Sequence, residues 1–197
     1  MKKYYFFLTL LMLFSCLEKE RNTNSLEKIL ISEDSLFLKN SAIGKVLINP
    51  KNESTVSGEL FIRSEKKTCY INGKISGLKP GKLHAIHIHE KGDCSSHCGT
   101  SAGGHWNPLY QIHGKWNEES KEGYHLGDIG NIKADSSGIA IINFKTSNWS
   151  FNDNSNLDIL GKSIIIHADA DDLVSQPSGN AGKRIGCGVI KLITNEK

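Results

Sequence analysis

The histidines of this chain are grouped in a pattern that suggests metal binding. Seven of the eight lie between residues 84 and 125, and the eighth, His167, ends an apolar run. His87 and His89 stand two residues apart in a β-branched stretch, so a strand would place both on one face and His84 on the other. Two neighbouring imidazoles on a rigid strand can hold a metal ion. For this motif alone, a pair of exposed histidines without a ligand is the alternative interpretation.

A long segment without strand signals, residues 91–133, follows this stretch. Loops of more than about 15 residues in a compact domain are usually functional or disordered. The segment has little apolar material to fold around, so metal ions and a disulfide would have to hold it in place. Its candidate ligands are Cys94, His97, Cys98, His105, His113, His125 and Asp128. Imidazole suits copper and zinc and carboxylate suits zinc, but spacing alone assigns no histidine to an ion, and a single zinc would also fit.

Short strands separated by turn residues must position these side chains. The patterns of apolar residues and turn residues predict strands at 42–48, 55–63, 68–75, 84–90, 138–145, 162–167 and 186–193. Strands this short, spaced by turns, predict an all-β antiparallel sandwich or flattened barrel. We expect one such domain over residues 42–197, without internal repeats or a second domain.

The charge balance argues against one class of partner. The chain carries 24 Lys and Arg against 21 Asp and Glu, a net charge of +3. Lys2 and Lys3 lie in a segment that we expect to be removed, which leaves 22 basic against 21 acidic residues, or +1. Because nucleic-acid binding usually needs a concentrated basic surface, we expect no nucleic-acid partner.

The first residues have the features of an export signal. Two lysines precede an apolar core of 11 residues, Tyr4 to Phe14, which is too short to span a bilayer. The core ends at Leu-Phe-Ser-Cys, which resembles a bacterial lipoprotein signal; residues 1–15 would be removed and Cys16 acylated. An ordinary secretory signal with an incidental Cys16 is the alternative. The polar residues 16–41 would form a tether, so we expect an exported protein, lipid-anchored in the cell envelope on the periplasmic or cell-surface side of a bacterial membrane.

Five stretches together resemble the copper,zinc superoxide dismutases. In family order they are 87–94 (HIHEKGDC), 100–108 (TSAGGHWNP), 125–131 (HLGDIGN), 167–172 (HADADD) and 179–190 (GNAGKRIGCGVI). The resemblance covers roughly residues 44–193 of the chain. It implies a Greek-key, eight-stranded flattened β-barrel or sandwich with long metal-binding and electrostatic loops, which agrees with the strand pattern.

The resemblance implies one copper ion and one zinc ion per subunit. It places copper at His87, His89, His105 and His167 and zinc at His105, His113, His125 and Asp128, with His84 and His97 outside both sets. His105 would then bridge the two ions. Asp171 would hydrogen-bond one copper ligand, His87, and one zinc ligand, His113, from outside, which fixes ring orientation and tautomer.

The resemblance also implies a disulfide between Cys94 and Cys187, at the position that bacterial members use. Closing a loop of this length would stabilise the fold by about 4–5 kcal/mol in the chain-entropy model. Cys98 is a rival partner for Cys187, because it lies nearer the position used in eukaryotic members. We expect Cys69 to be a small core residue on a strand, although a Cys69–Cys98 bridge stays open.

The reaction implied by the resemblance is the conversion of superoxide to oxygen and hydrogen peroxide. Copper would change oxidation state, while zinc, which has no accessible second state, would hold the loop. The catalytic residues would be His105, which would carry a proton to the product, and Arg184, a permanent cation that would bind the anion. Lys183 adds local positive charge, and Lys115 and Lys121 are further candidates for steering.

A non-catalytic copper- or zinc-binding lipoprotein, such as a metal buffer or chaperone, is the rival function. The complete ligand set and Arg184 argue against it. A structural β-sandwich adhesin would not need eight histidines in these motifs. Because related bacterial proteins include monomers and dimers, we expect a monomer or a homodimer.

Overall fold

The computed structural model describes residues 43–119 and 121–193. The expected signal peptide (1–15), the acylated Cys16 and the tether (16–41) lie outside these residues and stay predictions. Within the described residues, no helix is long and apolar enough to cross a membrane.

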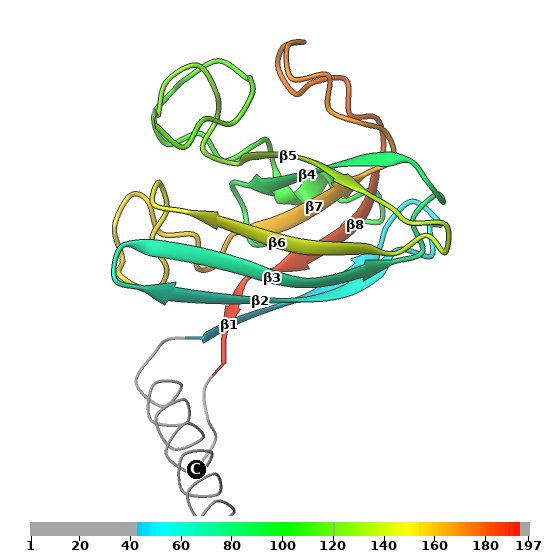
Figure 1. The fold of residues 1–197 in the computed structure, drawn as a ribbon, viewed down its shortest axis with the longest axis horizontal. Helices are drawn as coiled ribbons and strands as arrows, with labels where there is room; N and C mark the ends of the chain where they lie inside the picture. The colour runs from blue at the N-terminus through cyan, green and yellow to red at the C-terminus, as the bar shows by residue number, and fades with distance from the viewer. Residues whose placement is uncertain (1–42, 120, 194–197) are drawn as a thin grey trace, which may run out of the picture. The chain divides into compact units, whose positions relative to one another are not determined.

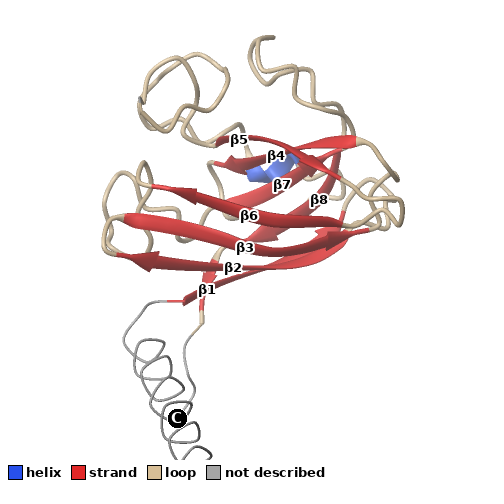
Figure 2. Cartoon of the chain, viewed as in Figure 1, coloured by secondary structure: helices blue, strands red, loops and turns tan. Residues whose placement is uncertain are grey.

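The described chain consists of nine strands and one short 3-10 helix joined by loops (Figure 2). In chain order these are β1 (Ile43–Pro50), β2 (Ser57–Glu65), β3 (Thr68–Ser76), β4 (Leu83–His89), η1 (Thr100–Ala102), β5 (Asp128–Lys133), β6 (Ala140–Thr146), β7 (Ser163–His167), β8 (Arg184–Val189) and β9 (Lys191–Leu192). Six of the seven predicted strands are present as single strands, with their ends shifted by at most two residues.

The strands form one antiparallel sheet that curls into a nearly closed barrel (Figure 1). Their order is β5-β4-β7-β8-β1-β2-β3-β6, and the short β9 pairs with β1 beside this path. The connections from β3 to β4 and from β6 to β7 cross the gap between the end strands β5 and β6, and each passes two strands on the way, which is a Greek-key arrangement. The predicted all-β barrel of eight principal strands is therefore confirmed.

Alternate residues of the strands fill the barrel interior, as the pleat requires. On β1, Val46 and Ile48 are buried, whereas Leu47 between them is 54% exposed. The neighbouring strands contribute to the same core Leu60, Ile62, Ile71, Ile75, Ile86, Ile88, Ile164 and Ile166. This alternation is the pattern that made the strands predictable from sequence.

One strand lies where none was expected, at the end of the 91–133 segment. The sequence of β5, Asp-Ile-Gly-Asn-Ile-Lys, is short and polar and contains Gly130 at φ 108°, so local propensity carries little signal. Pairing with β4 makes it a strand. The predicted strand 186–193 is instead divided at Ile190, whose N–H donates to Lys162 O and whose carbonyl accepts from Gly161 N.

The strand β4 is buried on both faces, and this places its histidines. Ile86 and Ile88 belong to the barrel core. Because side chains alternate along a strand, His87 and His89 lie on the opposite, outer face, where loops cover them completely. A strand buried on both faces can therefore hold polar ligands away from water without disturbing the apolar core.

Candidate metal centre

The histidines of the strands and of the long loop meet in two adjacent clusters. The first contains His87, His89, His105 and His167, and the second contains His105, His113, His125 and Asp128. In each cluster one ligand atom per residue lies within 4.8 Å of all the others, and every residue is buried. These are the two sets for which the sequence predicts copper and zinc, and the structure brings each set together.

Two β-bulges aim side chains at the clusters. In the pairing of β4 with β5 the register shifts between Ile86 and His87, which sets His87 opposite Asp128. In the pairing of β7 with β8 it shifts between Ile166 and His167, which sets His167 opposite Arg184. Bulges bend a strand locally and redirect its side chains, and here both occur at the site.

The loop histidine His105 is fixed by backbone pairing to the end of β4. His89 and His105 form an isolated antiparallel bridge, and Trp106 N donates to Ile88 O at 2.8 Å. Trp106 is 4% exposed and belongs to the barrel core, so it anchors the loop beside its ligand. Backbone pairing therefore ties His105 to the end of β4, although it lies in a long loop.

The inward nitrogens of the first cluster make no hydrogen bond within the part of the chain that the structure describes. They are His87 Nδ1, His89 Nε2, His105 Nε2 and His167 Nε2. An unpaired buried polar group costs about 1–3 kcal/mol, so four that converge on one point are strongly unfavourable unless a ligand binds them. Four convergent imidazole nitrogens are a donor set that suits copper.

Hydrogen bonds hold the opposite nitrogen of each strand histidine. Such bonds orient the ring and leave its other nitrogen free for a metal. The contacts are His87 Nε2 to Asp171 Oδ2 at 2.8 Å, His89 Nδ1 to Gly103 O at 2.9 Å, and His167 Nδ1 to Gly182 O at 3.4 Å.

The second cluster brings three imidazole nitrogens and one carboxylate within reach of a single ion. Asp128 Oδ1 lies 2.7 Å from His105 Nδ1 and 3.3 Å from His125 Nδ1, and these two nitrogens are 3.5 Å apart. His113 Nδ1 lies 2.9 Å from Asp128 Oδ2 yet makes no hydrogen bond there. Tetrahedral zinc with bonds of 2.0–2.1 Å would separate its ligands by about 3.3–3.4 Å, which the two His125 distances approach and the shorter Asp128–His105 distance does not. Three nitrogens and a carboxylate are a donor set that suits zinc.

The two clusters share one residue, His105. Its Nε2 faces the first cluster and its Nδ1 faces Asp128 in the second. One imidazole can therefore contact both metal positions at once.

Asp171, in the loop after β7, links the two clusters from outside. Its Oδ2 is 2.8 Å from His87 Nε2 and its Oδ1 is 3.0 Å from His113 Nε2. The Asn131 amide donates to the Asp171 carbonyl and accepts from its N–H, both at 2.8 Å. Gly179 packs against the carboxylate at φ 67°, and a Cβ there would lie 1.9 Å from Oδ1, so only glycine fits.

Burial favours the neutral form of three histidines of the first cluster, His89, His105 and His167. It lowers the pKa of His105 to about 4 and of His167 to about 3, and it holds the pKa of His89 well below 6.5. Burial raises the pKa of Asp128, but its close contacts with the three histidines of the second cluster outweigh this effect and hold the pKa well below 3.8. Neutral imidazoles and an ionised carboxylate are the forms that bind metal.

A cavity of about 360 Å³ opens beside the first cluster. Its walls include His89, His105 and His167 and, from the loop before β8, Pro177. Of the described residues that line it, Arg184 alone carries a permanent charge. The Arg184 guanidinium donates from Nη1 to Gly99 O at 2.8 Å and retains further N–H groups for a ligand. A small anion would fit this combination of volume and charge.

Comparison with known proteins gives a consistent result. The family model described as copper/zinc superoxide dismutase matches residues 56–190. The chain belongs to the copper/zinc superoxide dismutase family. "Superoxide dismutase [Cu-Zn] 3" of Arabidopsis thaliana is 44% identical over 138 residues, which are 67% of this chain and 80% of that protein. "Superoxide dismutase [Cu-Zn] 5" of Dictyostelium discoideum is 43% identical over 134 residues, 64% of this chain and 83% of the relative.

A solved structure agrees with this assignment. The crystal structure of a double mutant of a SOD-like protein from Bacillus subtilis matches with a TM-score of 0.66 and 35% identity, covering 75% of this chain and 96% of that chain. The predicted activity, a superoxide dismutase with copper and zinc as cofactors, is confirmed by the family.

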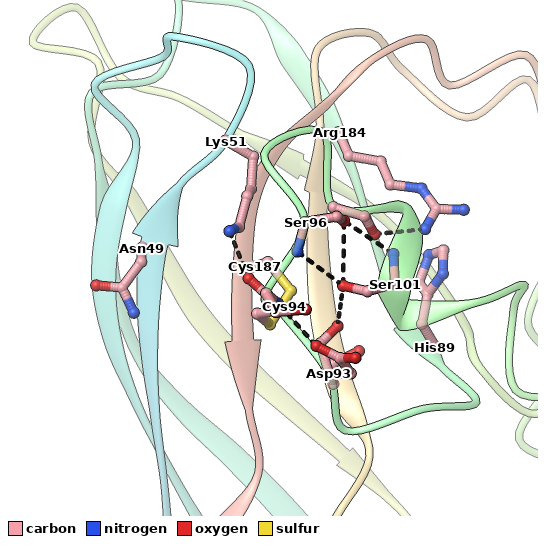
Figure 3. The surroundings of a disulfide bond; sticks show 12 residues. Asn49, Lys51, His89, Asp93, Cys94, Ser96, Ser101, Arg184 and Cys187 are labelled. Atoms are coloured by element: carbon pink, nitrogen blue, oxygen red, sulfur yellow. Dashed lines mark hydrogen bonds between the residues drawn. A yellow bond between two sulfur atoms is a disulfide. The ribbon is translucent and has the colours of Figure 1, made fainter.

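In this superoxide dismutase, Cys94 forms the disulfide with Cys187, at a sequence separation of 93 residues (Figure 3). Cys98, the rival partner, is a free, partly exposed thiol whose Sγ lies 3.1 Å from Thr100 Oγ1. Cys69 is free and buried in the core, so the Cys69–Cys98 bridge is not formed. The disulfide fastens the start of the long loop to β8.

The two histidines outside the ligand sets behave differently from one another. His84 is buried; its Nε2 accepts from Lys79 N at 3.2 Å and its Nδ1 lies 2.9 Å from the carbonyl of His167. It thus supports the backbone of a metal ligand, His167. His97 is exposed.

Sequence reasoning missed Gln176, whose side chain holds the metal-ligating residue His113 of the superoxide dismutase. The Gln176 side chain accepts from His113 N at 2.9 Å and donates to His113 O at 2.8 Å. No sequence signal marks an isolated glutamine as the partner of a residue 63 positions away. The candidate steering lysines Lys115, Lys121 and Lys183 are not among the residues that line the cavity.

Proposed function

We propose that the first cluster binds copper and the second binds zinc. The copper ligands are His87, His89, His105 and His167, and the zinc ligands are His105, His113, His125 and Asp128. The observation that carries this assignment is the convergence of four buried imidazole nitrogens without hydrogen-bond partners in the described chain. The carboxylate of Asp128 among three imidazoles favours zinc in the second cluster.

Two residues of the chain act on superoxide in this proposal. Copper, when bound, supplies the one-electron chemistry that converts superoxide to oxygen and hydrogen peroxide. Arg184 holds the anion in the cavity, because its planar, permanently charged guanidinium lies in the cavity wall. His105 lines the same cavity, and its Nε2 can hold a proton for the product only while that nitrogen is not bound to copper.

The proposal includes the location of the enzyme. Residues 1–15 are a lipoprotein signal peptide, Cys16 is acylated, and residues 16–41 tether the domain in the cell envelope. The support comes from the basic start, the short apolar core and the cysteine that follows it. An exported location also agrees with the Cys94–Cys187 disulfide, because disulfides persist in oxidising compartments.

Single ligand replacements test the metal assignment. His167→Gln should lose copper and activity while it retains zinc, and His125→Gln should lose mainly zinc. His97→Gln, which removes an exposed histidine outside both clusters, should keep both metals. Elemental analysis and superoxide decay are measured on each purified variant. Full copper and wild-type activity in His167→Gln would contradict the assignment.

A further inference from the structure

The turn between β1 and β2 is fastened to both segments that hold Arg184. Lys51 N donates to Ile185 O at 3.0 Å, at the start of β8. Asn52 N donates to His97 O at 3.1 Å, in the loop that follows the disulfide. This turn therefore joins two parts of the chain that meet at the cavity.

The side chain of Asn52 makes the same connection through one amide. Its Nδ2 donates to Arg184 O at 2.9 Å and, more weakly, to Cys98 O at 3.4 Å. A primary amide carries two hydrogens, so it can serve two carbonyls at once. Asn52 has a φ of 51°, a left-handed conformation that asparagine tolerates better than most residues.

The guanidinium of Arg184 rests on the residue next to Cys98. Its Nη1 donates to Gly99 O at 2.8 Å. A Cβ on Gly99 would lie 3.4 Å from both Cβ and Cδ of Arg184, so the stem of the arginine runs along this backbone. The Asn52 amide thus holds the backbone of Arg184 and the loop that supports its charged group.

We propose that Asn52 is a positioning residue for Arg184 and keeps its guanidinium beside the copper ligands His89 and His167. The inference rests on the proposed role of Arg184 in holding superoxide. The Cys94–Cys187 disulfide joins the same loop to β8 at another point. Loss of the amide should therefore displace the guanidinium without releasing the loop.

Asn52→Gly is the main test, because glycine accepts the left-handed backbone and removes only the amide. The second-order rate constant for superoxide should fall about three- to tenfold, as expected for one lost hydrogen bond. The affinity for azide, a small anion used as a probe of the cavity, should weaken similarly at unchanged copper and zinc content. Asn52→Asp, which keeps the size but cannot donate, should lose at least as much.

Asn49→Ala is the matched control. Among the described residues its Nδ2 donates to the nearby Leu47 O alone, at 3.2 Å, and Figure 3 shows its side chain pointing away from Arg184. This variant should keep the wild-type rate and azide affinity. A role of Asn52 in stability alone would lower the melting temperature of Asn52→Gly without changing azide affinity, and would overturn the proposal.

A double-mutant cycle with Arg184→Ala separates the positioning role of Asn52 from the anion-binding role of Arg184. If Asn52 acts through Arg184, Asn52→Gly should have no further effect on rate or azide affinity in the Arg184→Ala background. An equal loss in both backgrounds overturns the positioning role. If Arg184→Ala is impaired but both Asn52 variants match wild type, only the positioning role is wrong. If Arg184→Ala matches wild type with full metal, the proposed role of Arg184 is wrong as well.

Discussion

At the scale of single residues, Arg184 places a fixed charge beside histidines that are neutral. Burial lowers the pKa values of His105 and His167 to about 4 and about 3, so neither adds positive charge to the cavity at neutral pH. The attraction between the cavity and an anion therefore depends on the guanidinium and on the metal. An anionic substrate should be sensitive to any change in this one side chain.

Replacing Arg184 should change the rate in a charge-dependent order. Arg184→Ala should reduce the second-order rate constant several-fold, Arg184→Lys less, because the charge survives without the planar fork, and Arg184→Glu most. Wild-type rates should fall as salt rises, since exposed charges are screened beyond about 8 Å at physiological ionic strength. Pulse radiolysis across a salt series measures this, and the salt dependence should weaken or reverse in Arg184→Glu. Wild-type behaviour of both Ala and Glu variants with full metal would contradict the prediction.

Gly179 is a second residue for which the structure makes a specific prediction. Gly179→Ala should push Asp171 away from His87 and His113, because a Cβ would lie 1.9 Å from its Oδ1. Metal retention during dialysis and the melting temperature should both fall. Gly81→Ala is the control: Gly81 also has a positive φ of 70°, but a Cβ there meets nothing within 4 Å. Equal metal loss in the two variants would mean that backbone strain, and not the clash with Asp171, is responsible.

At the scale of elements, the long segment before β5 lacks a core of its own. Apart from η1 and the isolated bridge at His105, the structure describes no helix or strand between β4 and β5. The segment is held by the disulfide, by backbone pairing to β4 and by the residues of the second cluster. Removing the metal of the second cluster should therefore destabilise this segment, even though the barrel core does not contain the metal.

Zinc removal should cost more stability than activity. The melting temperature of copper-only protein should fall by about 10 °C or more, since each kcal/mol of lost binding energy corresponds to roughly 2–8 °C. The remaining copper should still support a large part of the dismutation rate at low temperature. Calorimetry of copper-only and fully metallated protein provides the comparison, with the disulfide intact in both. An unchanged midpoint would show that other contacts hold the segment.

At the scale of the whole molecule, lipid attachment should be separable from catalysis. Cys16→Ser should release the protein from membranes and leave the activity of the domain intact, because Cys16 lies 27 residues before β1 begins. Three acyl chains would anchor the wild type firmly, whereas one gives only marginal binding. Membrane fractionation and a superoxide assay on both fractions measure this. A variant that stays with the membrane would exclude Cys16 as the anchor.

The sequence by itself determined the barrel and the composition of the metal clusters. Alternating apolar residues predict strands such as β1 and β2, because the period of two is a local property of the pleat. The motifs around His87, His105 and His167 indicate metal binding, and their resemblance to the copper,zinc superoxide dismutases assigns the ligands to the two clusters. These features are local in the chain, and local patterns are what a sequence displays.

The tertiary structure alone decided which distant groups meet. It selected Cys94 over Cys98 as the partner of Cys187 and made β5 a strand through pairing with β4. It also brought Asn52 to the carbonyl of Arg184, 132 residues away. Such contacts form when the barrel closes and its turns come together. No local sequence pattern identifies the hydrogen-bond partner of a single asparagine in a turn.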